Sequence, residues 1–264
     1  MFTFYKPTNE FSIGIFHGTY YGLCLAIGIL AGLFLTSWLA RKRNLKSDDI
    51  YVVALFVLPL AILGARIYYC IFSGQSYTLL EFFSIWNGGL AVYGAIIGGA
   101  LGGLLYSLIF NKNYFLLFDV AVPGLLLGQA IGRIGCYFGG CCYGEVITDP
   151  NLQFFPLGVQ ISHIWHYSTF FMESLWTLIG FIVAISLFKK MKSIGMLTSF
   201  YMIWYGLGRS IIEQFRGDSL TIANTGIRVS QLISITILLI GLVSLIVNII
   251  DTRSEKKDKN GKEV

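Results

Sequence analysis

Charged residues are scarce in this chain of 264 residues. They make up 12% of it, against about 25% in an ordinary soluble domain, while 55% is hydrophobic and the mean hydropathy is +0.70. This composition excludes a soluble globular enzyme and a disordered chain. It also excludes a DNA-binding domain, because the basic residues behind the pI of 8.9 lie in loops and a tail. Three histidines and five cysteines argue against several metal centres.

Long apolar runs fill most of the chain, and they last about 20 residues rather than being short and alternating. The predicted fold class is therefore an all-α integral membrane protein and not a β-barrel. Residues 1–250 are expected to form one membrane domain, and residues 1–10 are polar and show no secretory signal. Seven transmembrane helices are expected, at residues 19–40, 50–73, 88–110, 115–135, 169–189, 194–215 and 229–250.

The distribution of lysine and arginine predicts the orientation of these spans. With the N-terminus outside, thirteen of the 19 basic residues fall in cytoplasmic segments and only three, Lys6, Arg216 and Arg228, fall outside. This positive-inside bias places the C-terminus in the cytoplasm, where the charged tail, residues 251–264, is expected to be disordered. The outer-face loop, residues 136–168, has no basic residue and many aromatic ones. It either anchors in the headgroup layer or covers a site that opens to the outer leaflet.

Glycines recur every four residues in three of the expected spans. Small residues at this spacing form a flat stripe that lets helices approach closely in lipid. Together the stripes predict a compact bundle with room for lipid tails. They are Gly28 and Gly32; Gly94, Gly98 and Gly102; and Gly124, Gly128 and Gly132.

Charged side chains in or at the ends of spans include Arg66, Arg133, Arg209 and Glu213. Such a side chain costs about 2.5–3.5 kcal/mol at the centre of the bilayer. Arg209 and Glu213 are four residues apart on one helix, so they are expected to pair. Arg66 and Arg133 have no acidic partner nearby in sequence. A guanidinium that faces a cavity is well suited to bind a phosphate through two parallel hydrogen bonds. For Arg66 a structural role is slightly favoured. The distant acidic candidates are Asp119, Glu145 and Glu173. These features predict an outward-facing site for an anionic lipid headgroup.

Several motifs resemble those of the bacterial prolipoprotein diacylglyceryl transferases. The two longest are residues 132–144 (GRIGCYFGGCCYG) and residues 205–218 (YGLGRSIIEQFRGD). Four shorter ones occur in the family's order, at residues 17–22, 64–66, 88–94 and 173–176. The resemblance covers about residues 12–250. Several motifs in the family's order, spread over seven expected spans, indicate the family far more specifically than one GRxG tetrapeptide does.

The resemblance implies an enzyme that transfers the diacylglyceryl group of phosphatidylglycerol to a lipobox cysteine of prolipoproteins, forming a thioether and releasing glycerol phosphate. Its partners would be this lipid, prolipoprotein signal peptides and the membrane, and it would not bind nucleic acid. It would be a monomer in the cytoplasmic membrane, with its active site toward the outer leaflet. No metal or organic cofactor is expected. The implied catalytic residues are Arg133, Arg209, Glu213, Tyr21 and Tyr93, and the implied phosphate contacts are Arg133, Arg209, Gly144 and Arg66.

The chain departs from the family's pattern at positions that matter for thiol activation. Tyr93 stands where many members have a histidine, and tyrosine is a poor base at neutral pH. Cys136 replaces the usual Asn and Cys141 the usual Glu. Tyr167-Ser-Thr169 stands where the family usually has His-Pro-Thr before Glu173. These changes keep open a lipid carrier with the same fold, or a transferase with another acceptor.

The identity of the general base is open after these changes. His17, His163 and His166 are candidates, and ionisation of the thiol beside Arg133 and Arg209 would need no base. Cys136, Cys141 and Cys142 have three interpretations: apolar packing, a disulfide from Cys136, or a zinc site with the two later histidines. Packing is the preferred interpretation, because the spacing matches no standard zinc motif.

Overall fold

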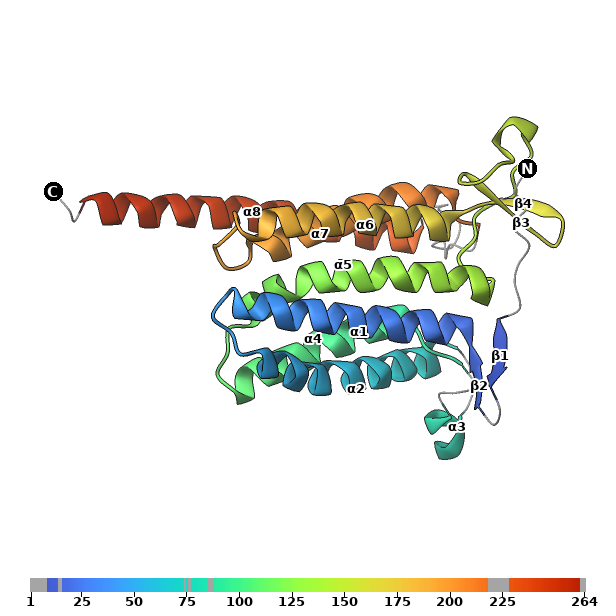
Figure 1. Ribbon diagram of the computed structural model, residues 1–264, viewed down its shortest axis with the longest axis horizontal. Helices are drawn as coiled ribbons and strands as arrows, with labels where there is room; N and C mark the ends of the chain where they lie inside the picture. The colour runs from blue at the N-terminus through green and yellow to red at the C-terminus, as the bar shows by residue number, and fades with distance from the viewer. Residues whose placement is uncertain are drawn as a thin grey trace. The chain divides into compact units, whose positions relative to one another are not determined.

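The computed structural model describes residues 9–13, 16–73, 75, 77–84, 88–217 and 228–261. These residues are mainly helical, with two small β-hairpins (Figure 1). The predicted class, a helical membrane protein, is confirmed. The long helices are α1 (Tyr20–Arg41), α2 (Ser47–Phe72), α4 (Val92–Ile109), α5 (Tyr114–Gly139), α6 (Thr169–Phe188), α7 (Met196–Ile212) and α8 (Val229–Gly261).

Six of the described helices are long and apolar enough to cross a membrane, namely α1, α2, α4, α5, α6 and residues Ser230–Ser254 of α8. The remaining long helix, α7, has only 17 residues. Its last turn tightens into the 3₁₀ helix η3 (Glu213–Phe215). The sequence-based span at residues 194–215 therefore corresponds to two elements.

Two expected boundaries differ from the structure. Helix α5 continues to Gly139, so the expected loop at residues 136–168 begins at Gly140 instead. Gly140 has a φ of 60°, a left-handed conformation that commonly follows the end of a helix. Helix α8 extends to Gly261, through most of the expected tail. Lysine and glutamate are good helix formers, and extending an existing helix costs little.

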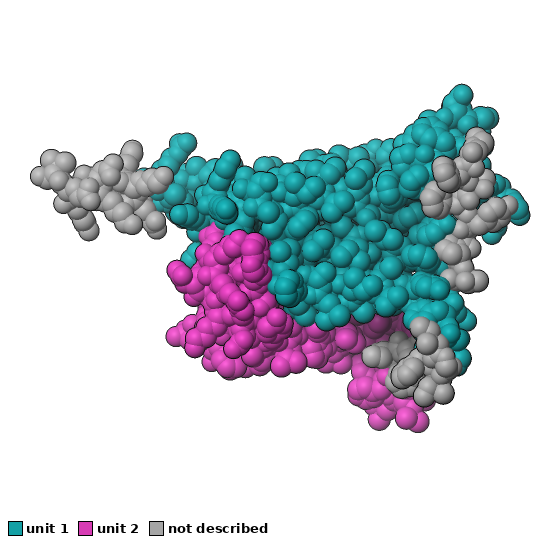
Figure 2. Space-filling view, in the orientation of Figure 1, with its two compact units in different colours: residues 1–35, 118–264 teal, residues 36–117 magenta. Residues whose placement is uncertain are grey.

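The chain divides into two compact units, coloured separately in Figure 2. Unit 2 comprises residues 36–117 and is built on α2 and α4. The glycine stripe of α4 lies against α2: a Cβ atom added to Gly102 would lie 2.7 Å from the Phe56 carbonyl oxygen. Lys112, after α4, pairs with Asp49 in the first turn of α2 at 2.8 Å. The stripe thus serves close helix contact, as predicted.

Unit 1 comprises residues 1–35 and 118–264. Within it, α1 and α5 touch through their glycine stripes. A Cβ atom on Gly28 would lie 2.8 Å from the carbonyl oxygen of Gly128, and one on Gly32 would lie 2.7 Å from that of Gly124. This close contact holds the start of α1 beside the end of α5, where the signature motif lies.

Buried polar contacts fix α7 within unit 1. The carboxylate of Asp119, on α5, accepts hydrogen bonds from the backbone N–H groups of Gly195 and Thr198 at 2.7 Å each and from the Thr198 hydroxyl at 2.6 Å. Asp119 therefore caps the start of α7. Trp176 on α6 and Trp204 on α7 each donate an indole N–H to the other's carbonyl oxygen at 3.0 Å. These contacts set the position of α7, which carries Arg209.

Two hairpins adjoin the ends of these helices. Strands β1 (Glu10–Ile13) and β2 (Phe16–Thr19) pair directly before α1. Strands β3 (Gly158–Ile161) and β4 (Ile164–Tyr167) pair directly before α6. The remaining short elements are α3 (Leu79–Phe83) and the 3₁₀ helix η2 (Pro150–Leu152). The second hairpin gives the expected outer-face loop a folded structure.

Candidate active site

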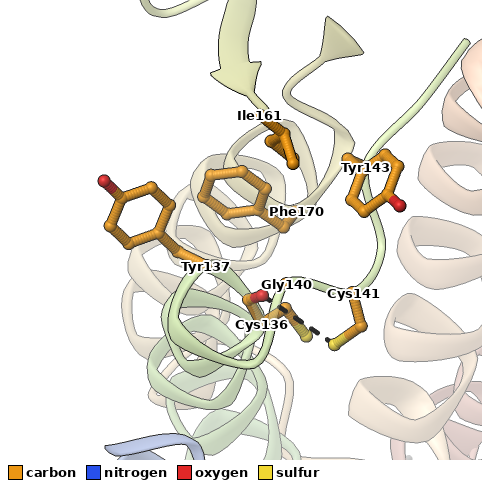
Figure 3. A pocket seen from close by; sticks show the side chains of 7 residues that line it. All are labelled: Cys136, Tyr137, Gly140, Cys141, Tyr143, Ile161 and Phe170. Atoms are coloured by element: carbon orange, nitrogen blue, oxygen red, sulfur yellow. Dashed lines mark hydrogen bonds between the residues drawn. The ribbon is translucent and has the colours of Figure 1, made fainter. Parts of the chain in front are cut away.

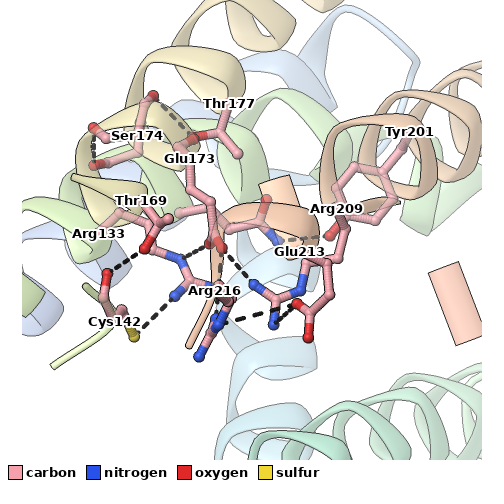
Figure 4. Close-up of polar contacts among 12 residues, drawn as sticks. Arg133, Cys142, Thr169, Glu173, Ser174, Thr177, Tyr201, Arg209, Glu213 and Arg216 are labelled. Atoms are coloured by element: carbon pink, nitrogen blue, oxygen red, sulfur yellow. Dashed lines mark hydrogen bonds and ion pairs between the residues drawn. The ribbon is translucent and has the colours of Figure 1, made fainter. Parts of the chain in front are cut away.

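A cluster of five charged side chains lies where α5, α6 and α7 meet at one end of unit 1 (Figure 4). Glu173 is at its centre. Its Oε2 atom lies 2.6 Å from Nε of Arg133, and its Oε1 atom pairs with Nη1 of Arg209. Oε1 also lies 3.7 Å from Nη1 of Arg216. One carboxylate thus joins three guanidinium groups, from α5, from α7 and from the residue that follows η3.

Glu213 completes this cluster. Its Oε2 atom lies 3.0 Å from Nη2 of Arg209 and 4.0 Å from Nε of Arg216. The pair predicted from the i, i+4 spacing of Arg209 and Glu213 is therefore confirmed. The side chains of both glutamates are less than a tenth exposed, and those of Arg209 and Arg216 are 14% and 12% exposed. Among the described residues, three arginines and two carboxylates thus make up the cluster.

The three guanidinium groups give the cluster its chemical character. Buried charges are tolerated only when they are paired, and the two carboxylates hold the arginines in place. Each guanidinium has five N–H donors, more than the contacts of Arg133 and Arg209 with these glutamates require. The arrangement suits a further anion such as a phosphate, which binds to arginine through parallel hydrogen bonds.

The chain after α5 folds back onto Arg133. Its Nη1 atom donates to Sγ of Cys142 at 3.4 Å. The Cys142 carbonyl oxygen accepts from the Thr169 hydroxyl at 2.6 Å and from the Phe170 N–H at 3.0 Å, which ties this loop to the start of α6. Hydrogen bonds from the Cys136 and Cys141 thiols, followed by the charges of Arg133 and Arg216, hold the pKa of Cys142 below its usual value.

Gly144, the last residue of the signature motif, is held against the segment that carries Glu213. Its N–H donates to the Tyr167 carbonyl at 2.7 Å, and it forms a β-bridge with Arg216. A Cβ atom at this position would collide with the Phe215 carbonyl and lie 2.7 Å from Cβ of Tyr167. Gly144 therefore permits a close backbone approach that positions Arg216.

Arg228 also fastens this segment. Its Nη1 atom donates to the Glu213 carbonyl oxygen, and its Nη2 atom lies 3.1 Å from Oε1 of Glu145. Glu145, one of the predicted distant partners, thus pairs with Arg228 at the edge of the site, whereas Glu173 is the partner of Arg133.

Tyr21 lies in the first turn of α1, beside the last turns of α5. Added Cβ atoms on Gly135 and Gly139 would lie 3.4 and 3.5 Å from its ring. The phenol is within electrostatic range of Arg133 and of Cys136, Cys141 and Cys142. The structure thus brings four of the predicted site residues, Tyr21, Arg133, Arg209 and Glu213, into one region of unit 1, with Gly144 beside it.

Arg66 and Tyr93 belong to unit 2. Arg66 is buried, and its guanidinium donates to the backbone carbonyls of Glu81, Phe82, Gly88 and Gly89 at 2.5–3.0 Å. These bonds use four of its five N–H groups and fix the segment after α3, so the geometry favours the structural role. Tyr93 is in the first turn of α4, with its ring centroid 6.2 Å from that of Tyr68.

Two members of the charged cluster, Glu173 and Arg216, are not predicted as site residues from the sequence. Glu173 appears there only as a possible distant partner, and Arg216 only as an outside basic residue. The signal for Arg216 was present, because residues 209, 213 and 216 are spaced by four and three and so share one helix face. For Glu173 no spacing rule applies, because the chain must fold before it reaches Arg133.

The structure places three of the cysteines close together and places His166 against the signature loop. All five cysteines are free thiols, so the disulfide interpretation is not supported. The Sγ atoms of Cys136, Cys141 and Cys142 lie within 4.8 Å of one another, and neither later histidine belongs to this group. The ring of His166 makes a 3.0 Å hydrogen bond to the Gly144 carbonyl through Nδ1. In Figure 3, Cys136 and Cys141 border a small pocket with Tyr143, Ile161 and Phe170.

Comparisons with known proteins agree with the motifs. The family model described as prolipoprotein diacylglyceryl transferase matches residues 9–247. Relatives named phosphatidylglycerol–prolipoprotein diacylglyceryl transferase include that of Streptococcus agalactiae serotype Ia, which is 38% identical over 242 residues, or 89% of this chain and 93% of the relative. That of Streptococcus equi subsp. zooepidemicus is 39% identical over 241 residues, with 88% and 92% covered. That of Streptococcus pyogenes serotype M5 is 40% identical over 235 residues, with 86% and 89% covered. The chain therefore belongs to the prolipoprotein diacylglyceryl transferase family.

Proposed function

We propose that this protein transfers the diacylglyceryl group of phosphatidylglycerol to the thiol of the lipobox cysteine in prolipoproteins. The product is a thioether, and glycerol phosphate leaves. The family and the names of the relatives support the reaction. The structural observation that carries it is the buried cluster of Arg133, Arg209, Arg216, Glu173 and Glu213, in which carboxylates hold three guanidinium groups together.

The chemistry of this reaction matches that cluster. The sulfur attacks the glycerol carbon that bears the phosphate, and negative charge grows on the phosphate oxygen as the carbon–oxygen bond breaks. Arg133 and Arg209 are the residues that would hold the phosphate and stabilise this charge, and Glu213 would orient Arg209. Because glutamates fix the guanidinium groups before the reaction, little reorganisation is needed in the transition state. Tyr21 would border the same site.

The membrane placement that we propose follows from the charges of unit 1. Lys189, Lys190 and Lys192 follow the end of α6, whereas Glu173 and the charge cluster lie at its start. The positive-inside rule then puts the lysines in the cytoplasm and the cluster at the outer leaflet of the bacterial cytoplasmic membrane. In this proposal α7 is a further, short span, which makes seven, with the N-terminus outside. A monomer suffices, because one chain supplies all five charged residues.

A lipid carrier with the same fold, or a transferase with another acceptor, is the alternative from the sequence analysis. A carrier needs a phosphate-binding site, but it does not need to stabilise a departing phosphate. A single arginine would serve for carriage, whereas this chain fixes three around Glu173. The names of the relatives also favour the transferase.

The test is direct. Purified protein is mixed with phosphatidylglycerol vesicles and a lipobox peptide, and mass spectrometry follows the peptide. We expect a mass gain of one diacylglyceryl group on the cysteine, and no gain for the same peptide with serine in its place. Folded protein that binds the peptide without modifying it would contradict the proposal and favour a carrier.

A further inference from the structure

Three thiols gather at the end of α5, beside the arginine of the signature motif. The Sγ atoms of Cys136, Cys141 and Cys142 lie within 4.8 Å of one another. Cys136 is in the last turn of α5, and the Cys141 N–H donates to its carbonyl oxygen at 3.1 Å. Gly140 and Cys142 have φ values of 60° and 57°. This tight reversal of the chain brings the second and third thiols back onto the first, as Figure 3 shows for Cys141.

The spacing of these sulfur atoms suits a thiophilic metal ion. Zinc binds cysteine at about 2.3 Å, so two thiolates on one tetrahedral ion lie roughly 3.8 Å apart. Sulfur atoms that already lie within 4.8 Å need only small side-chain movements to reach this distance. All three cysteines are free of disulfides.

Three ligands from the protein leave one position of a tetrahedral ion open. Catalytic zinc sites have this form, whereas structural sites use four protein ligands. Cys136 is buried and Cys141 is exposed, so the group is accessible from the Cys141 side. The pocket that borders Cys136 and Cys141 has Tyr143, Ile161 and Phe170 among its walls. This pocket is small and largely apolar, so an incoming group would approach the ion from the exposed Cys141 side.

The charges around the thiols also fit. A divalent ion with three thiolates carries one net negative charge. Arg133, whose Nη1 atom donates to Sγ of Cys142 at 3.4 Å, supplies a compensating positive charge. Hydrogen bonds of this kind from outside the coordination sphere orient the ligands of a metal and tune its reactivity. The same arginine pairs with Glu173, so the thiols lie next to the charge cluster.

We propose that Cys136, Cys141 and Cys142 bind one zinc ion and that its open position binds the thiol of the acceptor cysteine. The second half rests on the proposed function. On binding zinc, the acceptor thiol releases its proton to solvent. The zinc-bound sulfur then forms the bond to the glycerol carbon. The carbon–oxygen bond breaks at the same time, and the electron pair of that bond leaves with glycerol phosphate. Zinc is neither oxidised nor reduced.

Such a site explains how the acceptor is ionised in this chain. A free thiol has a pKa near 8.5 and is mostly protonated at neutral pH, whereas a thiol bound to zinc is deprotonated. The metal thus takes over the task of a general base.

The first experiment measures metal binding without turnover. Full-length protein is purified in detergent under reducing conditions, loaded with Zn²⁺ or Co²⁺, and desalted. We expect one ion per chain and, with Co²⁺, an intense sulfur-to-cobalt charge-transfer band. The Cys136→Ser, Cys141→Ser and Cys142→Ser variants should lose the band or bind far more weakly, whereas Cys70→Ser should match the wild type. Wild-type protein that keeps no ion and shows no band would overturn the proposal.

The second experiment adds a lipobox peptide to the Co²⁺ protein. The peptide thiol should change the cobalt spectrum, and the serine peptide should not. Chelation should lower transfer at least tenfold, and Zn²⁺ should restore it. Transfer that is unaffected in fully metal-free protein would refute thiol activation and leave the proposed function intact. Metal binding and the spectral change without transfer under any condition would support the site and refute the transferase.

Discussion

A single carboxylate holds the candidate site together at the scale of residues. Glu173 contacts Arg133, Arg209 and Arg216, and its side chain is only 8% exposed. In a buried site, removing one partner leaves a charge without compensation, which typically costs about 3–5 kcal/mol. The positions of the three guanidinium groups therefore depend on one another.

The arginines are expected to act on the departing phosphate. Arg133→Ala and Arg209→Ala should each lower the transfer rate by about 10²–10³, the usual effect of losing one donor to a developing anion. Lysine in their place keeps the charge but loses the planar pair of donors, so partial activity is expected. Lys112→Ala, which removes only the pair with Asp49, is the control. The rate is read from lipidated peptide by mass spectrometry, and wild-type rates in both alanine variants would refute the assignment.

Glu173 and Glu145 offer a matched comparison. Glu173→Gln removes the shared charge among three arginines and should lower both the thermal midpoint in detergent and the transfer rate, the rate by more than tenfold. Glu145, which is 53% exposed and pairs with Arg228, should tolerate the same change with little effect, as exposed ion pairs contribute about 0–1 kcal/mol. Similar losses in both variants would show that Glu173 has no special place in the site.

Local spacing predicts some of these contacts and cannot predict others. The pair of Arg209 and Glu213 follows from one helical turn. The pair of Arg133 and Glu173 joins α5 and α6, so only the folded chain defines it. The contacts of Arg66 are equally hard to predict from the sequence. Its partners are backbone carbonyl groups of the irregular segment around α3, and every residue type has such a group.

At the scale of elements, apolar length predicts the long helices well, because hydrophobic runs and helix length are directly related in a membrane. The hairpins are not predicted. Strands β3 and β4 have four residues each, too short for an alternating pattern to stand out among aromatic side chains. The extension of α5 to Gly139 is also missed, although it decides that Cys136 is helical.

The glycine stripe of α4 gives a test with a neighbouring control. A Cβ atom on Gly98 would collide with the Leu60 carbonyl of α2, whereas one on Gly99 would meet only side-chain atoms at 3.6 and 3.7 Å. Gly98→Ala should therefore destabilise the protein by about 1–3 kcal/mol, the usual cost of overpacking, and Gly99→Ala should not. The measurement is the thermal midpoint in detergent. Equal midpoints for the two variants would contradict the contact.

Gly144 tests the link between the signature loop and η3. Alanine at this position would collide with the Phe215 carbonyl and displace the segment that carries Glu213 and Arg216. We expect Gly144→Ala to lower the transfer rate at least tenfold while the protein still inserts and purifies normally. Gly139→Ala, whose added Cβ would meet only ordinary contacts at 3.5–3.6 Å, is the control. Transfer at the wild-type rate in Gly144→Ala would show that the close approach is dispensable.

At the scale of the whole molecule, the charge pattern predicts an orientation that geometry alone does not determine. The loop of residues 140–168 has no basic residue, whereas the connection from α6 to α7 carries three lysines. These two segments lie at opposite ends of α6. Because cytoplasmic loops hold an excess of Lys and Arg, the first segment and the charge cluster should face outward.

Epitope tags decide this orientation. One tag is inserted at Asn151, in the exposed turn η2, and the other at Lys190, after α6. Antibodies applied to intact spheroplasts should bind the first tag and reach the second only after permeabilisation. Both tagged proteins must retain lipid transfer, so that a misfolded chain is not scored. The reverse pattern in active protein would place the charge cluster at the cytoplasmic leaflet, where a secreted prolipoprotein would have to be modified before its mature part crosses the membrane.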